Sequence, residues 1–242
     1  MRRVFAAFLL CVGIACIAQA QNIVGSGIYG DVKKASGGGA ESYAFPNAPQ
    51  TANPTGLTQA FTVTLGAASS NRIVVALFGI QNNPTVNSVN GGAGCGSPTL
   101  SQVETDGSGG GMSIWAGVVA TGTSCIFTIT AAGAMLSDDV NFAVYTITNP
   151  VSTSVKHICG AAFGCTINVT AGDYLFAGSF GASGNFNGST QTPSGVCVTN
   201  GCTIVGANGN NLSLADWTIV STNASFSVSN SGSNYNAATS WH

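Results

Sequence analysis

Apolar and polar side chains alternate along several short segments of this chain, and this period of two limits the fold more than any other feature. Phe61, Val63 and Leu65 alternate with threonines, and Phe226 and Val228 alternate with serines. Successive side chains of a β-strand point to opposite faces, so each segment predicts a strand with one buried and one solvated face. No window has a helical period, and glycine and asparagine stand at the junctions, as tight turns require. The sequence therefore predicts an all-β fold.

The same succession of segments occurs twice. An alternating segment followed by an apolar one is found at 61–78 and again at 166–177, and each pair is followed by a tryptophan, Trp115 or Trp217. Segments 73–78 and 174–180 are apolar on both faces, which predicts central strands. The matched tryptophans are expected in the core, one in each half.

We expect pseudo-repeats at about 58–148 and 164–242, folded as one antiparallel β-sandwich of jelly-roll or immunoglobulin-like type over residues 41–242. The alternative is two tandem domains, since each half is long enough for an immunoglobulin-like sandwich. The junction at 148–156 is no longer and no more polar than the other loops, which favours the single sandwich.

The N-terminus has the features of an export signal. Arg2 and Arg3 precede an apolar run over 5–17, and Ala18-Gln19-Ala20 supplies the small residues of a cleavage site. The run is shorter than the roughly 20 residues that span a bilayer. We predict a signal peptide over 1–20, with lipoprotein processing at Cys16 as the alternative. Residues 21–40 are glycine-rich and are expected to be a flexible lead, and the protein is expected to be secreted, extracellular or in the cell envelope.

Beyond the predicted signal peptide the chain carries four basic and eight acidic side chains, a net charge of −4. Nucleic-acid binding needs clustered basic side chains that neutralise phosphates, so this balance argues against it. No later segment approaches membrane-spanning length. Surface polarity must therefore come from serine, threonine, asparagine and glycine.

Six cysteines follow the signal peptide, an even number that indicates disulfides in an exported chain. They are Cys95, Cys125, Cys159, Cys165, Cys197 and Cys202. Each of the pairs Cys159–Cys165 and Cys197–Cys202 brackets a short turn, and the second turn contains Asn200-Gly201. The remaining pair is then Cys95–Cys125. A zinc site built from two such pairs is the alternative.

Catalytic patterns are weak. The two histidines, His157 and His242, lie outside any nucleophile motif, and we interpret them as a loop residue and a chain end. Glu104 and Asp106 are the candidates for an acid/base pair, but the glycine run after Asp106 favours a solvated loop. We expect no enzyme activity and no cofactor.

Two kinds of binding residue are nevertheless candidates. Asp138 and Asp139, adjacent in one loop, are a weak calcium site, because Ca²⁺ takes several oxygen ligands from a loop. Sugar-binding proteins stack sugars on exposed aromatic side chains, and Trp241, Tyr235 and Tyr43 suit that role best.

Several segments together suggest a family. The apolar strand Arg72-Ile-Val-Val-Ala, the segment 85–92, an Ile-Trp strand and the Cys-Ile-Phe-Thr-Ile strand at 125–129 occur in this order. Over residues 58–242 this pattern resembles bacterial exported and phage-associated β-sandwich proteins, many without an assigned activity, and the resemblance carries no catalytic residues.

We therefore expect a secreted or cell-surface structural and binding protein that attaches to an extracellular glycan, a surface component or copies of itself. The alternatives are a carbohydrate-active enzyme or its accessory domain, and a self-assembling fibre or virion-like subunit.

Overall fold

The computed structural model describes residues 40–242 apart from 45–49, 82–83, 107–110, 136–139, 162–163, 182–185, 189–201, 206–210 and 231–234. Within this part of the chain all regular elements are β-strands except one 3-10 turn, η1 (Ala93–Cys95). Every strand pair in it is antiparallel. The predicted all-β, antiparallel class is confirmed.

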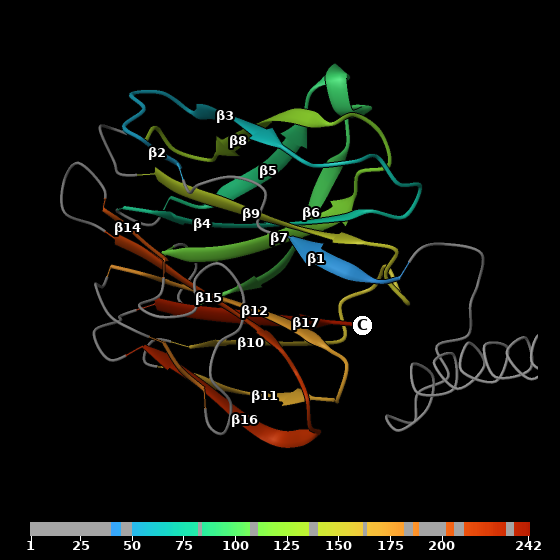
Figure 1. Cartoon of the computed structure of the whole chain (residues 1–242). Helices are drawn as coiled ribbons and strands as arrows, with labels where there is room; N and C mark the ends of the chain where they lie inside the picture. The colour runs from blue at the N-terminus through green and yellow to red at the C-terminus, as the bar shows by residue number, and fades with distance from the viewer. Residues whose placement is uncertain are drawn as a thin grey trace, which may run out of the picture. The chain divides into compact units, whose positions relative to one another are not determined.

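The first half of the chain forms a nine-stranded sheet in the order β1-β9-β4-β7-β6-β5-β8-β3, with β2 beside β9. Its strands are β1 (Ser42–Ala44), β2 (Gln50–Ala52), β3 (Thr58–Thr64), β4 (Ile73–Ile80), β5 (Val86–Gly91), β6 (Thr99–Thr105), β7 (Met112–Val118), β8 (Ser124–Ala131) and β9 (Val140–Thr148). The sheet curls, so that β3, β5 and β8 lie over β4, β7 and β9 and share one apolar cluster with them (Figure 1).

The second half forms two sheets, in the orders β10-β17-β12-β15-β14 and β11-β16-β13. Its strands are β10 (His157–Ala161), β11 (Cys165–Val169), β12 (Tyr174–Phe180), β13 (Phe186–Gly188), β14 (Cys202–Val205), β15 (Asn211–Thr218), β16 (Asn223–Asn230) and β17 (Tyr235–Trp241). Side chains from β11 and β16 pack against β12, β15 and β17 in a second shared cluster.

Strand order is the same in the two halves. The order β1-β9-β4-β7-β6 of the first half matches β10-β17-β12-β15-β14 of the second, and β5-β8-β3 matches β13-β16-β11. Equivalent strands also follow one another in the same order along the chain, with β2 as the one described strand that lacks a counterpart. The first strand of each half therefore pairs with the last, which brings the ends of each half together.

Three apolar clusters separate four layers of strands, which are stacked from top to bottom in Figure 1. Strand β4 is buried on both faces, because Val74 and Phe78 enter the cluster beneath β3 and β8 while Val75 and Leu77 pack against β12. Strand β12 is also buried throughout. Both segments are thus central strands, as predicted.

The predicted positions of the two matched tryptophans are also confirmed. Trp115 lies in the first cluster and Trp217 in the third, and both side chains are buried. The middle cluster joins the two halves through aromatic and aliphatic side chains of β4, β7 and β9 on one side and β12, β15 and β17 on the other.

Candidate functional site

Strands β3, β8 and β5 present an uncharged outer face of hydroxyl and amide groups. We call this surface the Thr face. It comprises Thr58, Ala60, Thr62 and Thr64 of β3, Ser124, Ile126, Thr128 and Thr130 of β8, and Ser88 and Asn90 of β5. Their side chains are exposed or half-buried, whereas most of the alternate residues, among them Phe61 and Phe127, are buried in the core.

The register across the three strands places the polar side chains in rows. Thr130 lies between Thr58 of β3 and Ser88 of β5, and Thr128 lies between Ala60 and Asn90. Within one row neighbouring side chains are about 5 Å apart, close enough to bind one extended ligand together. Asn90 Nδ2 donates a hydrogen bond to Ser88 Oγ at 3.1 Å, so part of the face is already ordered.

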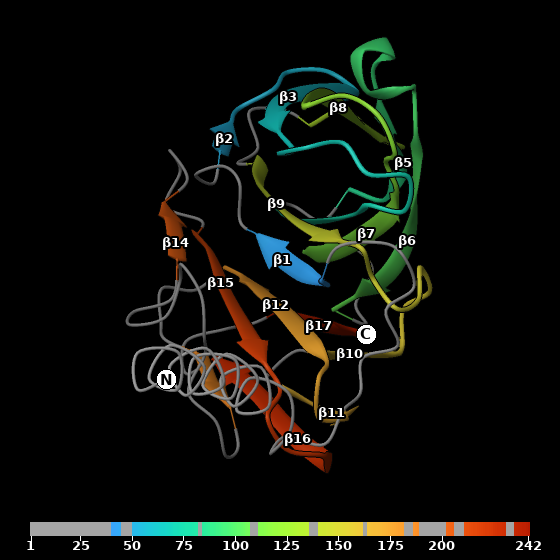
Figure 2. The same ribbon diagram turned by 45° about the vertical axis from the view of Figure 1, so that its right-hand side comes forward.

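A second outer face occurs at the opposite end of the stack, on β11 and β16 (Figure 2). Thr166 and Asn168 of β11 and Ser225 and Ser227 of β16 are exposed, and Thr166 pairs with Ser227. The sequences of β3, β5, β8, β11, β13 and β16 contain no charged residue. The strands of both outer faces are therefore free of charged residues.

The charged side chains that the structure describes lie elsewhere, and Arg72 is one of the two that are fully buried. It is fully buried and immediately precedes β4. Its guanidinium donates hydrogen bonds of 2.8–3.3 Å to the backbone carbonyls of Leu65, Gly66, Ala67, Val119, Thr121 and Gly122. Burial lowers the pKa of Arg72. This side chain holds the turns at 65–67 and 119–122 together and has no donor turned to solvent in that arrangement.

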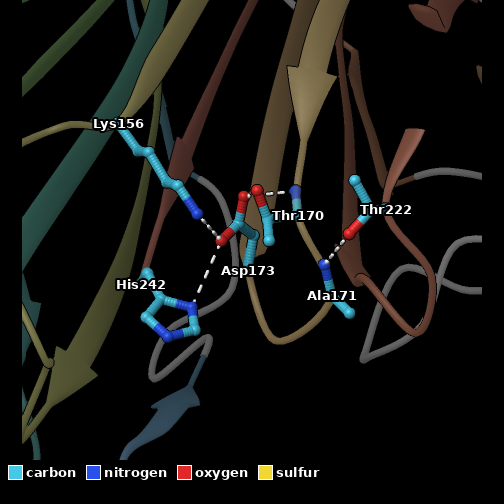
Figure 3. A network of polar contacts seen from close by, with 6 residues as sticks. All are labelled: Lys156, Thr170, Ala171, Asp173, Thr222 and His242. Carbon is cyan, nitrogen blue, oxygen red and sulfur yellow. Dashed lines mark hydrogen bonds and ion pairs between the residues drawn. The ribbon is translucent and has the colours of Figure 1, made fainter. Parts of the chain in front are cut away.

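Asp173 immediately precedes β12 and is the centre of a second polar cluster, shown in Figure 3. Its carboxylate is fully buried and accepts hydrogen bonds from Lys156 Nζ and Thr170 N, each at 2.8 Å. His242 Nδ1 lies 3.2 Å from the same oxygen as Lys156. Beside this cluster Ala171 N donates to Thr222 Oγ1 at 3.2 Å.

An imidazole oriented by a buried carboxylate is the base of a catalytic triad, but within the described part of the chain no hydroxyl or thiol nucleophile is hydrogen-bonded to His242. Its ring is only partly exposed, at 37%. The sequence-based interpretation of His242 as a simple chain end missed the contact with Asp173. The sequence did contain a signal for a structural role of Asp173, because Asp173 and Arg72 hold matching places directly before an apolar strand of the repeat. It contained no signal that His242 would be the partner. His157, interpreted as a loop residue, is instead the first residue of β10.

A third buried group, Asp216, joins the two halves. Tyr43 Oη donates to Asp216 Oδ1 at 2.8 Å, and the hydroxyl of Tyr145 also bonds to this carboxyl. Burial raises the pKa of Asp216 from its ordinary 3.8 to about 6, and the hydrogen bonds from the two tyrosines lower it in part. Because Asp216 comes from β15 and the tyrosines from β1 and β9, the group titrates inside the packing between the halves.

The three aromatic residues predicted to stack on a ligand lie in this same packing layer. Trp241 is 2% exposed, and Tyr235 is half-buried against the middle cluster. Tyr43 is half-buried, with ring centroids 4.8 Å from Tyr174 and 5.6 Å from Phe176. None of the three belongs to either outer face.

The carboxylates that the structure describes among the predicted candidates are bonded to backbone N–H groups. Glu104 Oε1 accepts from Thr105 N at 2.8 Å, and Asp106, which is buried, accepts from Met112 N at 3.0 Å. Asp106 is thus not solvated, as the sequence had suggested, but is buried and links the end of β6 to the start of β7. Asp138 and Asp139 lie outside the described residues.

Two of the predicted disulfides are confirmed, Cys95–Cys125 and Cys159–Cys165. The first ties η1 to β8 and the second ties β10 to β11. The third predicted pair joins Cys197 with Cys202. Cys197 lies outside the described residues, so this pair stays a prediction.

No protein-family model matches this chain, and no curated protein matches its sequence. The part of the chain that the structure describes contains no helix that is long and apolar enough to cross a membrane. In the same part of the chain no three histidine, cysteine or acidic side chains gather as a metal site would require.

Proposed function

We propose that this protein is an exported, cell-surface binding protein that attaches to a neutral extracellular polysaccharide through the Thr face. The observation that carries the proposal is the row arrangement of Thr58, Thr62, Thr128 and Thr130 on strands without a single charge. Each hydroxyl is both donor and acceptor, which suits the hydroxyl groups of a sugar chain.

The placement of charge supports a neutral ligand. A charged side chain on the face would select an ionic partner, but none of the charged side chains that the structure describes belongs to the strands of this face. Arg72, Asp106, Asp173 and Asp216 are buried, and exposed Lys156 precedes β10 in the other half. Exposed Ile126, at 53%, adds an apolar contact in the middle of the rows. Without an aromatic platform, each sugar unit would contribute little, so affinity would come from many units bound along one polymer.

Export is supported by the two disulfides, which persist in oxidising compartments. We propose a β-sandwich of the jelly-roll or immunoglobulin-like type in each half, which is the tandem alternative and not the single sandwich expected over residues 41–242. The separate apolar cluster inside each half supports this arrangement. We also propose binding without catalysis, and the local roles of Glu104 and Asp106 support this, since each carboxylate is engaged by a backbone N–H.

A sedimentation assay with insoluble neutral polysaccharides such as cellulose, chitin and β-glucan tests the proposal. The wild-type chain should sediment with at least one of them, and binding should change little between low and high salt, because no ion pairs are involved. Absence of binding to every neutral polymer, or binding that salt abolishes, would exclude the proposal.

Two matched variants identify the surface. Thr128→Arg places a charge in the centre of the Thr face, and Ser227→Arg places the same charge at the equivalent position of the other outer face. We expect Thr128→Arg to lose most of the binding and Ser227→Arg to retain it. Equal binding by the wild type and Thr128→Arg would assign attachment to another surface.

A further inference from the structure

Strand β3 lies at the edge of its sheet, and it is the longest edge strand that the structure describes. It has seven residues, while the other strands at sheet ends, β1, β10, β11, β13 and β14, have three to five. All seven residues pair with β8 in unbroken register. An edge of this kind presents a row of backbone N–H and C=O groups to a further strand.

Natural proteins usually protect such edges, and the sequence and the pairing of β3 lack the usual devices. Its sequence, Thr-Gln-Ala-Phe-Thr-Val-Thr, has no charge and no proline, and its pairing has no bulge. The equivalent edge, β11, is shorter, has a register shift between Ile167 and Val169, and is tied to β10 by the Cys159–Cys165 disulfide. One of two equivalent edges is thus protected and the other is not.

The outward carbonyl groups of β3 carry replaceable partners. Gln59 Nε2 donates to Ala60 O at 2.8 Å, and Gln50 Nε2 donates to Thr62 O at 2.7 Å, both in exposed surroundings. Residues 60 and 62 have the same parity, so their backbone groups point away from β8 together. Two neutral, solvent-accessible amides therefore occupy the positions that the N–H groups of an added strand would take.

We propose that β3 is a self-association edge, which pairs antiparallel with β3 of a second copy of this chain. A twofold axis normal to the sheet keeps each face on its own side, so Phe61 and Val63 of both copies stay over the core and the threonines stay outside. The pairing brings no like charges together, because β3 has none.

Self-pairing also extends the surface described above. The sheets of two copies would join as β5-β8-β3 followed by β3-β8-β5 of the partner, which doubles the Thr face without a break. This inference goes beyond the proposed function, and its test contains no polysaccharide, so the two can fail separately.

The test is the molar mass of the full chain, measured by sedimentation equilibrium over a range of protein concentrations. The wild type should reach twice the mass of a single chain as the concentration rises. Ala60 is exposed and lies beside Phe61, the middle residue of β3, so its side chain would be close to the twofold axis. Ala60→Lys and Ala60→Glu should each remain at the single-chain mass, because each would place two like charges diagonally across the axis, within reach of one another.

An equimolar mixture of the two variants should recover the double mass, since opposite charges then meet across the axis. This recovery also shows that both variants are folded. The matched controls are Thr166→Lys and Thr166→Glu on β11, which should both reach the wild-type mass. A wild type that stays at single-chain mass, variants of Ala60 that still double, or controls that fail to double would each overturn the proposal.

Discussion

Arg72 and Asp173 occupy equivalent positions in the two halves and carry opposite, fully buried charges. Each N–H donates at 3.0 Å to a carbonyl three residues earlier, Ser69 O or Thr170 O. Each carbonyl accepts at 2.8 Å from the backbone N–H of the residue that follows the tryptophan-containing strand, Val119 after β7 or Ile219 after β15. The backbone is thus repeated while the side-chain chemistry is reversed, because Arg72 bonds to carbonyls and Asp173 to donors.

Replacing Arg72 by methionine should destabilise the fold strongly. The change leaves buried carbonyls of the turns at 65–67 and 119–122 without donors, and one unsatisfied buried group costs about 1–3 kcal/mol. We expect a loss of about 3 kcal/mol in the free energy of unfolding, measured by urea denaturation. The stability of Arg72→Lys, which has fewer donors, should fall between that of the wild type and that of Arg72→Met. An unchanged urea midpoint for Arg72→Met would contradict the role assigned to this side chain.

Asp173→Asn should have a smaller effect. Asparagine still offers an oxygen to Thr170 N but removes the ion pair with Lys156, whose side chain is 32% exposed. Water screens a pair of this exposure, so we expect a loss of about 1 kcal/mol. Lys156→Gln serves as the control, because it removes the same pair and leaves the carboxylate in place. A loss as large as that of Arg72→Met would show that the ion pair is more important than its exposure suggests.

Stability should depend on pH through Asp216. Its pKa rises from 3.8 when unfolded to about 6 when folded, so the folded state favours the protonated form. Protonated Asp216 therefore makes its full contribution to the free energy of unfolding below pH 3.8, and this contribution is lost as the pH rises through about 6. The difference corresponds to about 3 kcal/mol.

Between pH 5 and pH 8 the wild type should become less stable, and Asp216→Asn should remove most of this slope. Tyr43→Phe should shift the slope to higher pH, because the hydrogen bond from Tyr43 lowers the pKa of Asp216. Thermal unfolding at a series of pH values measures both effects. A parallel pH dependence in the wild type and Asp216→Asn would place the titrating group elsewhere.

The packing between the halves should be sensitive at Gly79. Its equivalent in the second half is Phe180, and a Cβ at position 79 would collide with the ring of that same Phe180. We expect Gly79→Ala to cost about 2 kcal/mol, since an overpacked core forces its neighbours to shift. Combining it with Phe180→Leu should restore part of the loss. A double-mutant cycle measures the coupling, and strict additivity would mean that the two residues do not meet.

The two disulfides should contribute unequally. Cys95–Cys125 closes a sequence separation of 30 residues and Cys159–Cys165 one of 6. Because a cross-link restricts the unfolded chain more when its loop is longer, replacing Cys95 and Cys125 by alanine should cost about 1 kcal/mol more than replacing the other pair. Denaturant unfolding of the two double variants compares them. The reverse order would indicate that local strain or residual structure outweighs loop length.

Local pattern was sufficient for the strands and for the short-range links of this protein. The alternation of Phe61 with threonines and the apolar runs of β4 and β12 predicted half-buried and central strands, because a strand's side chains alternate whatever lies beyond them. The pairing of Cys159 with Cys165 followed from the short loop between them. The burial of Trp115 and Trp217 followed from their matching places in the repeat.

Only the tertiary structure decided where the isolated polar and aromatic side chains would lie. Trp241 and Tyr43 were candidates for exposed binding residues, but the second half packs against the first and places them in the layer between the halves. The same contact brings Tyr43 to Asp216, 173 residues away, and the end of the chain brings His242 to Asp173. Such positions depend on which sheets meet face to face, and the period of a single strand contains no information about its partner in another layer.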